Sequence, residues 1–346
     1  MIKNKALPGK IPPYALFFVL YISRVIVSLT NIQSVSVGKV NTRLLLSIVL
    51  GMVLTVVLSL PAYFCTKTDN LLQRNKFISL LYVVYYVYFC GVNICRFSYF
   101  AASRMSVTKP VIFFVLLITI AVAYCSSLGI EAVGRFGFFC GLIVVAVVAT
   151  VLVLNIHSFH AINFFPLGDS AQNTVLMNAL IFCSNSNEPV ILLALGKRTN
   201  GDIARPYFGS VIASFFSVLL LIAWSIGVMG SGATMQAYPV FTLFQLASIG
   251  SFSRLDIVHV AFWILALLVK ASVLVLSAAD CIGSGAKKSV ILSFVCGAIA
   301  VGIVQFLGTD MTEIARWVSI VGFVIFALVL PSVFLFIDRR KKRETL

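Results

Sequence analysis

The residues best suited to chemistry form one polar run inside a long apolar segment. The run Ser184–Pro189 reads Ser-Asn-Ser-Asn-Glu-Pro and interrupts residues 174–195, a stretch long enough to cross a bilayer as a helix. Pro189 lacks an amide hydrogen and disfavours helical geometry at the preceding Glu188. Because backbone freed in this way is tolerated in a membrane only beside a cavity or inside protein, the run predicts two half-helices with a polar gap. Transporters with broken helices bind their ligands in such gaps.

Glu188 is the first of three ionisable side chains that lie inside apolar segments, where charges are costly and are candidates for function. It either contacts a ligand or ion, or accepts hydrogen bonds from the amides freed by its own break. Arg24, at the middle of segment 14–30, either binds a carboxylate, pairs with Glu188 or extends to the interface. We predict the pairing because the two opposite charges share one depth.

Lys270, within segment 257–279, has three interpretations. It replaces a coupling cation, partners Glu188, or extends towards the inner membrane surface. Ser23-Arg24 also forms a polar interruption of the first segment, 14–30. With the polar run, these side chains define the predicted ligand-binding residues, which are Ser23, Arg24, Ser184, Asn185, Ser186, Asn187, Glu188 and Lys270.

The composition places these residues in an integral membrane protein. Of 346 residues, 60% are hydrophobic and 11% are charged, a balance that no soluble domain of this size carries. The connecting loops are too short for a second domain, so residues 1–346 are predicted to form one transmembrane domain with a basic tail at 338–346. The predicted spans are 14–30, 43–64, 77–100, 110–128, 137–156, 174–196, 206–229, 257–279, 289–307 and 315–337.

The net charge of +15 is distributed as expected for a membrane topology. With the N-terminus inside, most of the 26 Lys and Arg residues fall in cytoplasmic segments, which predicts that both termini are cytoplasmic. The basic tail should interact with anionic lipid. Nucleic-acid binding is not expected, because no folded soluble module is present to carry it.

The remaining candidate groups do not indicate an enzyme or a metalloprotein. The sequence contains no motif that pairs a catalytic nucleophile with a general base, and no Gly-rich phosphate loop or acidic metal motif. The eight cysteines contain no CxxC pair and are interpreted as small buried apolar residues. His157 and His160 lie in a loop with too few neighbouring ligands for a metal. We therefore predict no catalytic residue, metal or cofactor, and keep a membrane enzyme only as a third hypothesis.

An ordered set of short motifs resembles the B-subunits of spore germination receptors, within the amino acid–polyamine–organocation transporter superfamily. The resemblance spans the chain in layout, and its motifs concentrate between residues 161 and 272. They are Ala161–Pro166, Asn187-Glu188, Lys197-Arg198, Tyr238-Pro239, Ser253-Arg254-Leu255-Asp256, Trp263 and Lys270-Ala271-Ser272.

Two departures from the family pattern concern the ligand. Val25, Ile26 and Val27 stand where members commonly carry glycines in the first span, and Ser253 stands where they more often have Glu. In the wider superfamily, exposed amides at that position hold the carboxylate of an amino acid. Either the ligand here is not a simple amino acid, or Arg24 replaces the amide contacts.

The resemblance implies an all-α polytopic fold with about ten transmembrane helices, arranged as a LeuT-like 5+5 inverted repeat in which helices 1 and 6 are broken. It implies a nutrient receptor subunit in the inner membrane of a bacterial endospore, acting with an A-subunit and a lipoprotein C-subunit. A small molecule such as an amino acid would bind in a transporter-like cavity and signal germination. The alternative is a secondary transporter of amino acids or amines, which would share this fold.

Overall fold

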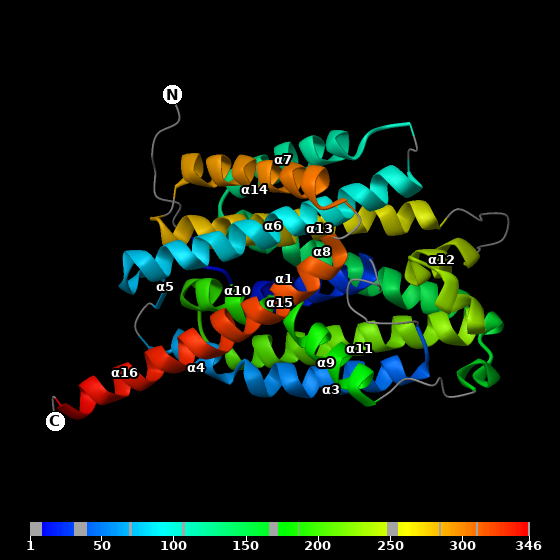
Figure 1. Ribbon diagram of the computed structural model, residues 1–346, viewed down its shortest axis with the longest axis horizontal. Helices are drawn as coiled ribbons and strands as arrows, with labels where there is room; N and C mark the ends of the chain where they lie inside the picture. The colour runs from blue at the N-terminus through cyan, green and yellow to red at the C-terminus, as the bar shows by residue number, and fades with distance from the viewer. Residues whose placement is uncertain are drawn as a thin grey trace.

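The computed structural model is a bundle of nearly parallel and antiparallel helices (Figure 1). It describes residues 9–30, 40–68, 71–105, 108–165, 172–185, 187–247, 255–283, 285–308 and 311–344. The helices of the first half are α1 (Pro13–Thr30), α3 (Thr42–Leu58), α4 (Leu60–Thr66), α5 (Leu71–Arg74), α6 (Lys76–Arg104), α7 (Val111–Ser127) and α8 (Ile130–Leu154).

The second half begins after two short 3-10 turns, Ile156–Ser158 and Ala161–Phe164. Its helices are α9 (Gln172–Ser184), α10 (Glu188–Leu195), α11 (Ala204–Met229), α12 (Pro239–Leu246), α13 (Asp256–Cys281), α14 (Ala286–Phe306), α15 (Met311–Phe323) and α16 (Leu330–Glu344), with a π-helical segment at Val324–Val329 between the last two. Helix α12, at Pro239–Leu246, is too short to cross a membrane.

Every predicted span coincides with an apolar helical segment of the structure. In the described part of the chain, eight such segments are long enough to cross a membrane, and the two remaining predicted spans correspond to the shorter apolar helices Pro13–Ile26 and Val111–Ser127. The segments therefore agree with the sequence, while the total of ten crossings stays a prediction.

The two halves repeat the same packing relationships, as an inverted repeat requires. Helix α1 packs on α11 as α9 packs on α3, and α6 packs on α14 as α7 packs on α13. Likewise, α1 contacts α8 as α9 contacts α15. Each helix of the first half thus has a counterpart in the second half, which is the architecture of transporters built from inverted repeats. The predicted fold class is confirmed in this respect.

Span six is broken where the sequence predicted. Helix α9 ends at Ser184 and α10 begins at Glu188, and Asn187 between them has a left-handed backbone with φ 65°. Asparagine tolerates this conformation better than most residues. Pro189 lies in the first turn of α10, where its missing amide hydrogen has no helical acceptor to lose. The proline therefore starts the second half-helix and does not kink a continuous one.

Span one is not broken, and the predicted interruption at Ser23-Arg24 is wrong. Helix α1 runs without a gap from Pro13 to Thr30. Polar side chains alone leave the backbone hydrogen bonds intact, and the segment 14–30 contains no glycine or further proline to disturb them. The polar residues of α1 therefore do not break its backbone.

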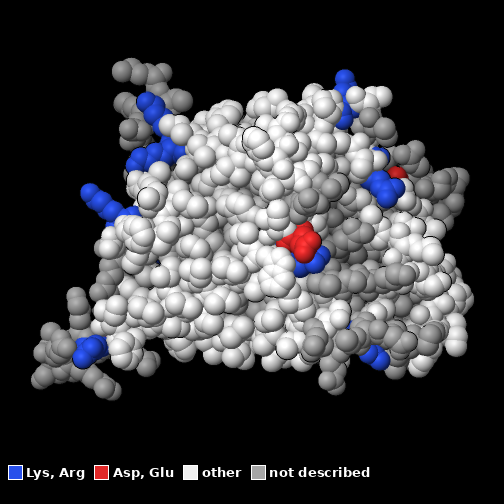
Figure 2. Space-filling model, in the orientation of Figure 1, with Lys and Arg blue, Asp and Glu red and all other residues white. Residues whose placement is uncertain are grey.

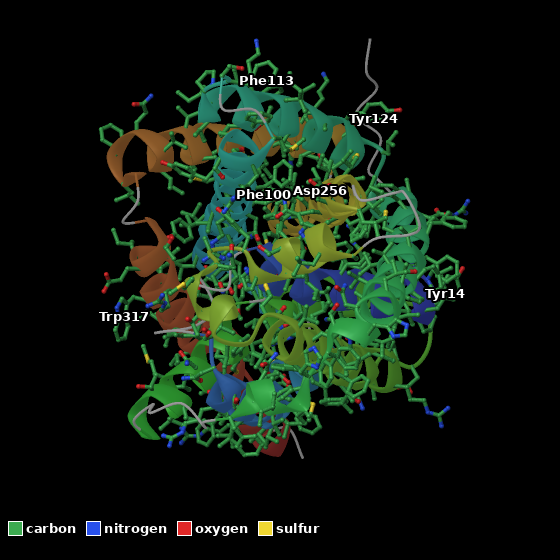
Figure 3. The ribbon with its side chains drawn as sticks, turned by 90° about the vertical axis from the view of Figure 1, so that its right-hand side faces the viewer. Tyr14, Phe100, Phe113, Tyr124, Asp256 and Trp317 are labelled. Atoms are coloured by element: carbon green, nitrogen blue, oxygen red, sulfur yellow. The ribbon has the colours of Figure 1, made fainter. Side chains whose placement is uncertain are left out.

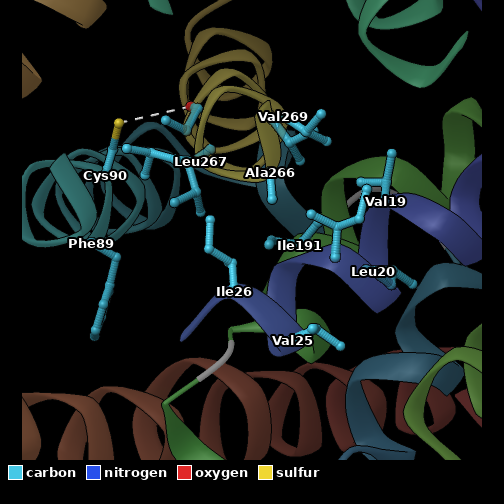
Figure 4. Close-up of a cluster of buried hydrophobic side chains, with 14 of the residues drawn as sticks. Val19, Leu20, Val25, Ile26, Phe89, Cys90, Ile191, Ala266, Leu267 and Val269 are labelled. Atoms are coloured by element: carbon cyan, nitrogen blue, oxygen red, sulfur yellow. Dashed lines mark hydrogen bonds between the residues drawn. The ribbon is translucent and has the colours of Figure 1, made fainter. Parts of the chain in front are cut away.

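The centre of the bundle is packed around α1. Ile26 of α1 points towards Leu267 of α13, and the Cys90 thiol approaches the carbonyl oxygen of Ala271 (Figure 4). Helix α8 also meets α1 closely, because a Cβ placed on Gly141 would lie 2.2 Å from the Phe18 ring. Small residues let membrane helices approach in this way.

On the face shown in Figure 2, most of the described surface carries no charged side chain. Lys and Arg lie mainly towards the left and right ends, with one small red and blue group near the middle. At the end of the bundle where α1 begins, the chain before α1 joins the chain after α10. The Ile11 amide donates to the Arg198 carbonyl at 2.8 Å, and the Asn200 amide donates to the Ile11 carbonyl at 3.0 Å. Arg198 also forms an ion pair with Asp280 at the end of α13. These contacts close one end of the bundle around the two central spans.

Candidate functional site

The predicted approach of Arg24 and Glu188 is confirmed, and the pair lies at the helix break. Nη2 of Arg24 donates to Oε2 of Glu188 at 2.6 Å, and each side chain is 1% exposed. Nη1 donates to the carbonyl oxygen of Phe182 at 2.7 Å, and the guanidinium carbon lies 3.9 Å from the centre of the Phe215 ring. Burial at this level excludes the interpretation in which Arg24 extends to the interface.

Both charges match the dipoles of the two half-helices. Phe182 lies in the last turn of α9, where carbonyl groups lose their helical partners and a cation is favoured. Glu188 is the first residue of α10, where a carboxylate is favoured. The break therefore creates the site that the ion pair occupies, and α1 supplies the cation from a continuous helix.

The ion pair leaves polar capacity unused. It is formed by one hydrogen bond only, and neither Nε of Arg24 nor Oε1 of Glu188 has a hydrogen-bond partner. Buried polar groups are usually satisfied, so unused donors and acceptors at a helix break are where a ligand or a water molecule would bind.

Lys270 of α13 contacts the backbone of α1. Its Nζ donates to the main-chain oxygen of Ser23 at 2.8 Å, and the side chain is 1% exposed. The interpretation in which Lys270 extends to the inner surface is therefore wrong, because the ammonium group points into the bundle and joins α13 to α1. Ser23 is also 1% exposed.

The polar run itself is held by side chains from distant helices. Asn185 Oδ1 accepts from Nη1 of Arg96 at 3.2 Å and from the Ser319 hydroxyl at 3.4 Å. Asn187 Oδ1 accepts from the Tyr85 hydroxyl at 3.2 Å, and its Nδ2 has no partner. Ser184 bonds only within its own helix, to the carbonyl of Ile181 at 3.3 Å, and Ser186 lies outside the described residues.

Two helices therefore contribute side chains that are absent from the predicted ligand-binding residues. Helix α6 brings Tyr85 and Arg96, and α15 brings Ser319. The first two could have been found from the sequence: Arg96 is an ionisable residue near a span end, and Tyr85 lies in the tyrosine-rich run Tyr82–Tyr88. Tyr86 of that run donates to the carbonyl oxygen of Val190 in α10 at 2.6 Å. Ser319 carries no signal of its own.

The buried charges at this centre are not balanced. Among the described residues, the charged side chains buried here are the cations of Arg24, Arg96 and Lys270 and the carboxylate of Glu188. An excess of buried positive charge is costly unless a negative group accompanies it. The electrostatics of the site therefore favour an anionic ligand or anionic group.

No group of three or more His, Cys, Asp or Glu residues that could hold a metal occurs within the described parts of the chain. All eight cysteines are free thiols, seven of them buried and Cys125 partly so. This agrees with their interpretation as apolar packing residues.

Comparison with known proteins identifies the fold and the family. The structure is similar to that of MHP1, a nucleobase-cation-symport-1 family transporter in a closed conformation with bromovinylhydantoin bound, with a TM-score of 0.64 and 14% sequence identity over 98% of this chain and 82% of that chain. The chain is thus a multi-pass integral membrane protein with a LeuT-like transporter fold. A search of curated proteins by sequence found no match.

The family follows from the sequence itself. Residues 10–305 match the model of the spore permease family, whose members are described as spore germination proteins. The match extends over most of the chain, and the chain belongs to this family. The resemblance seen in the short motifs between residues 161 and 272 is confirmed.

Proposed function

We propose that the protein is a nutrient receptor subunit that binds a small molecule at the break between α9 and α10 and signals spore germination. The observation that carries the proposal is the buried Arg24–Glu188 pair, which retains an unused donor and an unused acceptor at the break. Membership of the spore germination family supplies the biological context.

The ligand would contact the polar groups that converge on the break. The proposed binding residues are Ser23, Arg24, Ser184, Asn185, Ser186, Asn187, Glu188 and Lys270. Because these side chains come from α1, α9–α10 and α13, a bound ligand would favour one relative arrangement of those helices. A ligand shifts such an equilibrium only by its difference in affinity for the two arrangements. That difference would be the signal passed to the partner proteins.

The proposed partners are A-type and C-type germination receptor subunits, and the proposed location is the inner membrane of a bacterial endospore with both termini in the cytoplasm. The distribution of Lys and Arg between the two sides supports this orientation. Co-purification of the tagged chain from spore membranes is the direct measurement. Recovery of the chain without either partner under mild detergent conditions would argue against the assembly.

The test of the function uses spores in which Glu188→Gln replaces the natural chain. We expect nutrient-triggered germination, followed as the fall in optical density, to be lost or to need far more nutrient. Glu131→Gln is the matched control, because Glu131 forms an exposed pair with Arg135, with side chains 49% and 71% exposed. Normal nutrient responses from Glu188→Gln spores, with the variant present in the membrane, would contradict the proposal.

The second candidate is a secondary transporter of amino acids or amines. The similarity to a transporter structure favours it, since receptor and transporter would share one fold. Purified chain in proteoliposomes separates the two functions. Accumulation of labelled amino acids or amines that follows an imposed ion gradient would establish transport. Its absence, together with nutrient binding, would support a receptor.

A further inference from the structure

Arg96 of α6 is a buried cation with an unoccupied hydrogen-bonding edge. The side chain is 7% exposed, and Nη1 donates to Oδ1 of Asn185 at 3.2 Å. Its other two nitrogens, Nε and Nη2, are buried and have no hydrogen-bond partner. Of the ion pairs formed between described residues, none includes Arg96. A guanidinium in this state is costly, because burial removes its water and nothing replaces it.

The two nitrogens without partners form one edge of the guanidinium fork. Nε–H and Nη2–H point in the same direction from the planar group, and this edge matches the two oxygens of a carboxylate in a bidentate contact. The third nitrogen is already fixed by Asn185, so the orientation of the fork is set before a ligand arrives. We infer that Arg96 is the carboxylate-binding residue of a ligand site bounded by α6, α9 and α15.

The surroundings of Arg96 favour a negative charge. Lys270 of α13 and Arg316 of α15 act on Arg96 from neighbouring helices, and both have the same sign as Arg96. Glu313, one turn before Arg316, offsets that second cation. These are the acidic and the basic residue of α15, and a red and blue cluster lies over the start of this helix in Figure 2. The charge around Arg96 therefore stays positive, and a carboxylate supplies a negative charge.

The face of α15 turned to the bundle completes the site. Trp317 lies at the rim of the molecule and is 52% exposed, whereas Ser319 is 1% exposed and donates to Asn185 (Figure 3). A carboxylate on Arg96 would therefore be held beside the end of α9 and the inner face of α15. This inference names the chemical class of the ligand as carboxylic acids, amino acids included. It rests on the proposed function only for the claim that this ligand is the nutrient.

The experiment uses the purified full-length chain in detergent and measures its apparent unfolding temperature. Sodium acetate is the probe for the carboxylate, and sodium chloride and sodium phosphate at equal ionic strength are the comparisons. Because ligands stabilise the state that they bind, acetate should raise the unfolding temperature in a saturable way. Chloride, which cannot make the bidentate contact, should not.

Three variants locate the response. Arg96→Gln should abolish the shift produced by acetate, and Arg96→Lys, which keeps the charge but loses the fork, should weaken acetate binding by about tenfold. Arg104→Gln is the matched control, since Arg104 lies at the exposed end of the same helix. It should leave the acetate response unchanged. If Arg96→Gln fails to fold, the acetate affinity of Arg96→Lys still tests the inference.

Each of the other results overturns the inference. Coincident acetate and chloride curves in the natural chain would show that no carboxylate site exists. An acetate response retained by Arg96→Gln, or one of unchanged affinity in Arg96→Lys, would place the site elsewhere. A stronger response to phosphate than to acetate would reject the carboxylate. If Arg96→Gln loses the acetate response while Glu188→Gln spores germinate normally, this inference stands and the proposed function fails.

Discussion

Helix α1 and the pair α9–α10 are counterparts in the inverted repeat, yet they solve the same problem differently. Helix α1 is continuous and offers the centre a side chain, Arg24. The α9–α10 segment is interrupted and offers helix ends, around which Glu188, Asn185 and Asn187 gather. A continuous helix keeps its backbone groups paired at mid-span, so α1 contributes the Arg24 side chain and one main-chain oxygen, that of Ser23, which also accepts from Lys270.

The difference teaches that the two central spans depend on each other. The carbonyl of Phe182 at the end of α9 is satisfied by Arg24, and the charge of Arg24 is in turn balanced by Glu188. Removing a polar group from α1 or from α9–α10 therefore leaves a buried polar group without its partner in the other segment. The variants below probe that dependence, beginning with the most severe.

The largest effect is expected from Glu188→Ala. The substitution leaves the Arg24 guanidinium buried without its counter-ion, and breaking one partner of a buried pair typically costs about 3–5 kcal/mol. Chemical unfolding of the purified chain would measure the loss. Glu131→Ala, which breaks an exposed pair, should cost about 0.5 kcal/mol or less. Equal losses for both variants would contradict the dependence of α1 on the break.

Exchanging the two charges sharpens the same comparison. In the double variant Arg24→Glu with Glu188→Arg, the charges again attract each other, although both are now mismatched to the helix ends. We expect unfolding stability between that of the natural chain and that of the worse single variant. A double variant no more stable than the worse single variant would show that pairing contributes nothing.

An intermediate effect is expected at the closed end of the bundle. Arg198 and Asp280 are 23% and 14% exposed, so their ion pair is partly hydrated, unlike the pair at the centre. Arg198→Ala should cost about 1.5–2 kcal/mol, at the low end of the range for hydrogen bonds to charged groups, because the pair is partly hydrated. The Ile11–Thr199 backbone pairing would remain, because it needs no side chain. A loss as large as that of Glu188→Ala would mean that this end, and not the centre, holds the two spans together.

The break in span six could be predicted from the sequence because its cause is local. Pro189 and its polar neighbours act on their own backbone, so adjacent residues were enough to place it. The break expected in α1 was wrong because Ser23 and Arg24 make a segment polar without disturbing its hydrogen bonds. Span six has both polar side chains and a disrupted backbone, whereas span one has polar side chains in a continuous helix.

The contacts of the site could be predicted only in part. Arg24 and Glu188 share depth and have opposite charges, so their approach followed from the topology. The contact of Arg96 with Asn185 depends on the rotation of α6 against α9, which the apolar pattern of a membrane helix records weakly because lipid and protein interior are both apolar. Ser319 is a further example, since a serine within a span has no pattern that marks it as buried.

The smallest effect concerns the backbone of the break alone, and two variants of one residue isolate it. Asn187→Ala and Asn187→Gly both remove the hydrogen bond from Tyr85 and the side-chain amide. They differ in the left-handed backbone at φ 65°, which costs alanine roughly 1–2 kcal/mol and glycine almost nothing. We expect Asn187→Gly to be about 1 kcal/mol more stable than Asn187→Ala in chemical unfolding. At a matched position in continuous α1, Ile26→Gly should instead be less stable than Ile26→Ala, since glycine is unfavourable inside a helix. The same sign at both positions would mean that α1 and α9–α10 do not differ in their backbone at mid-span, and the comparison would then lose its basis.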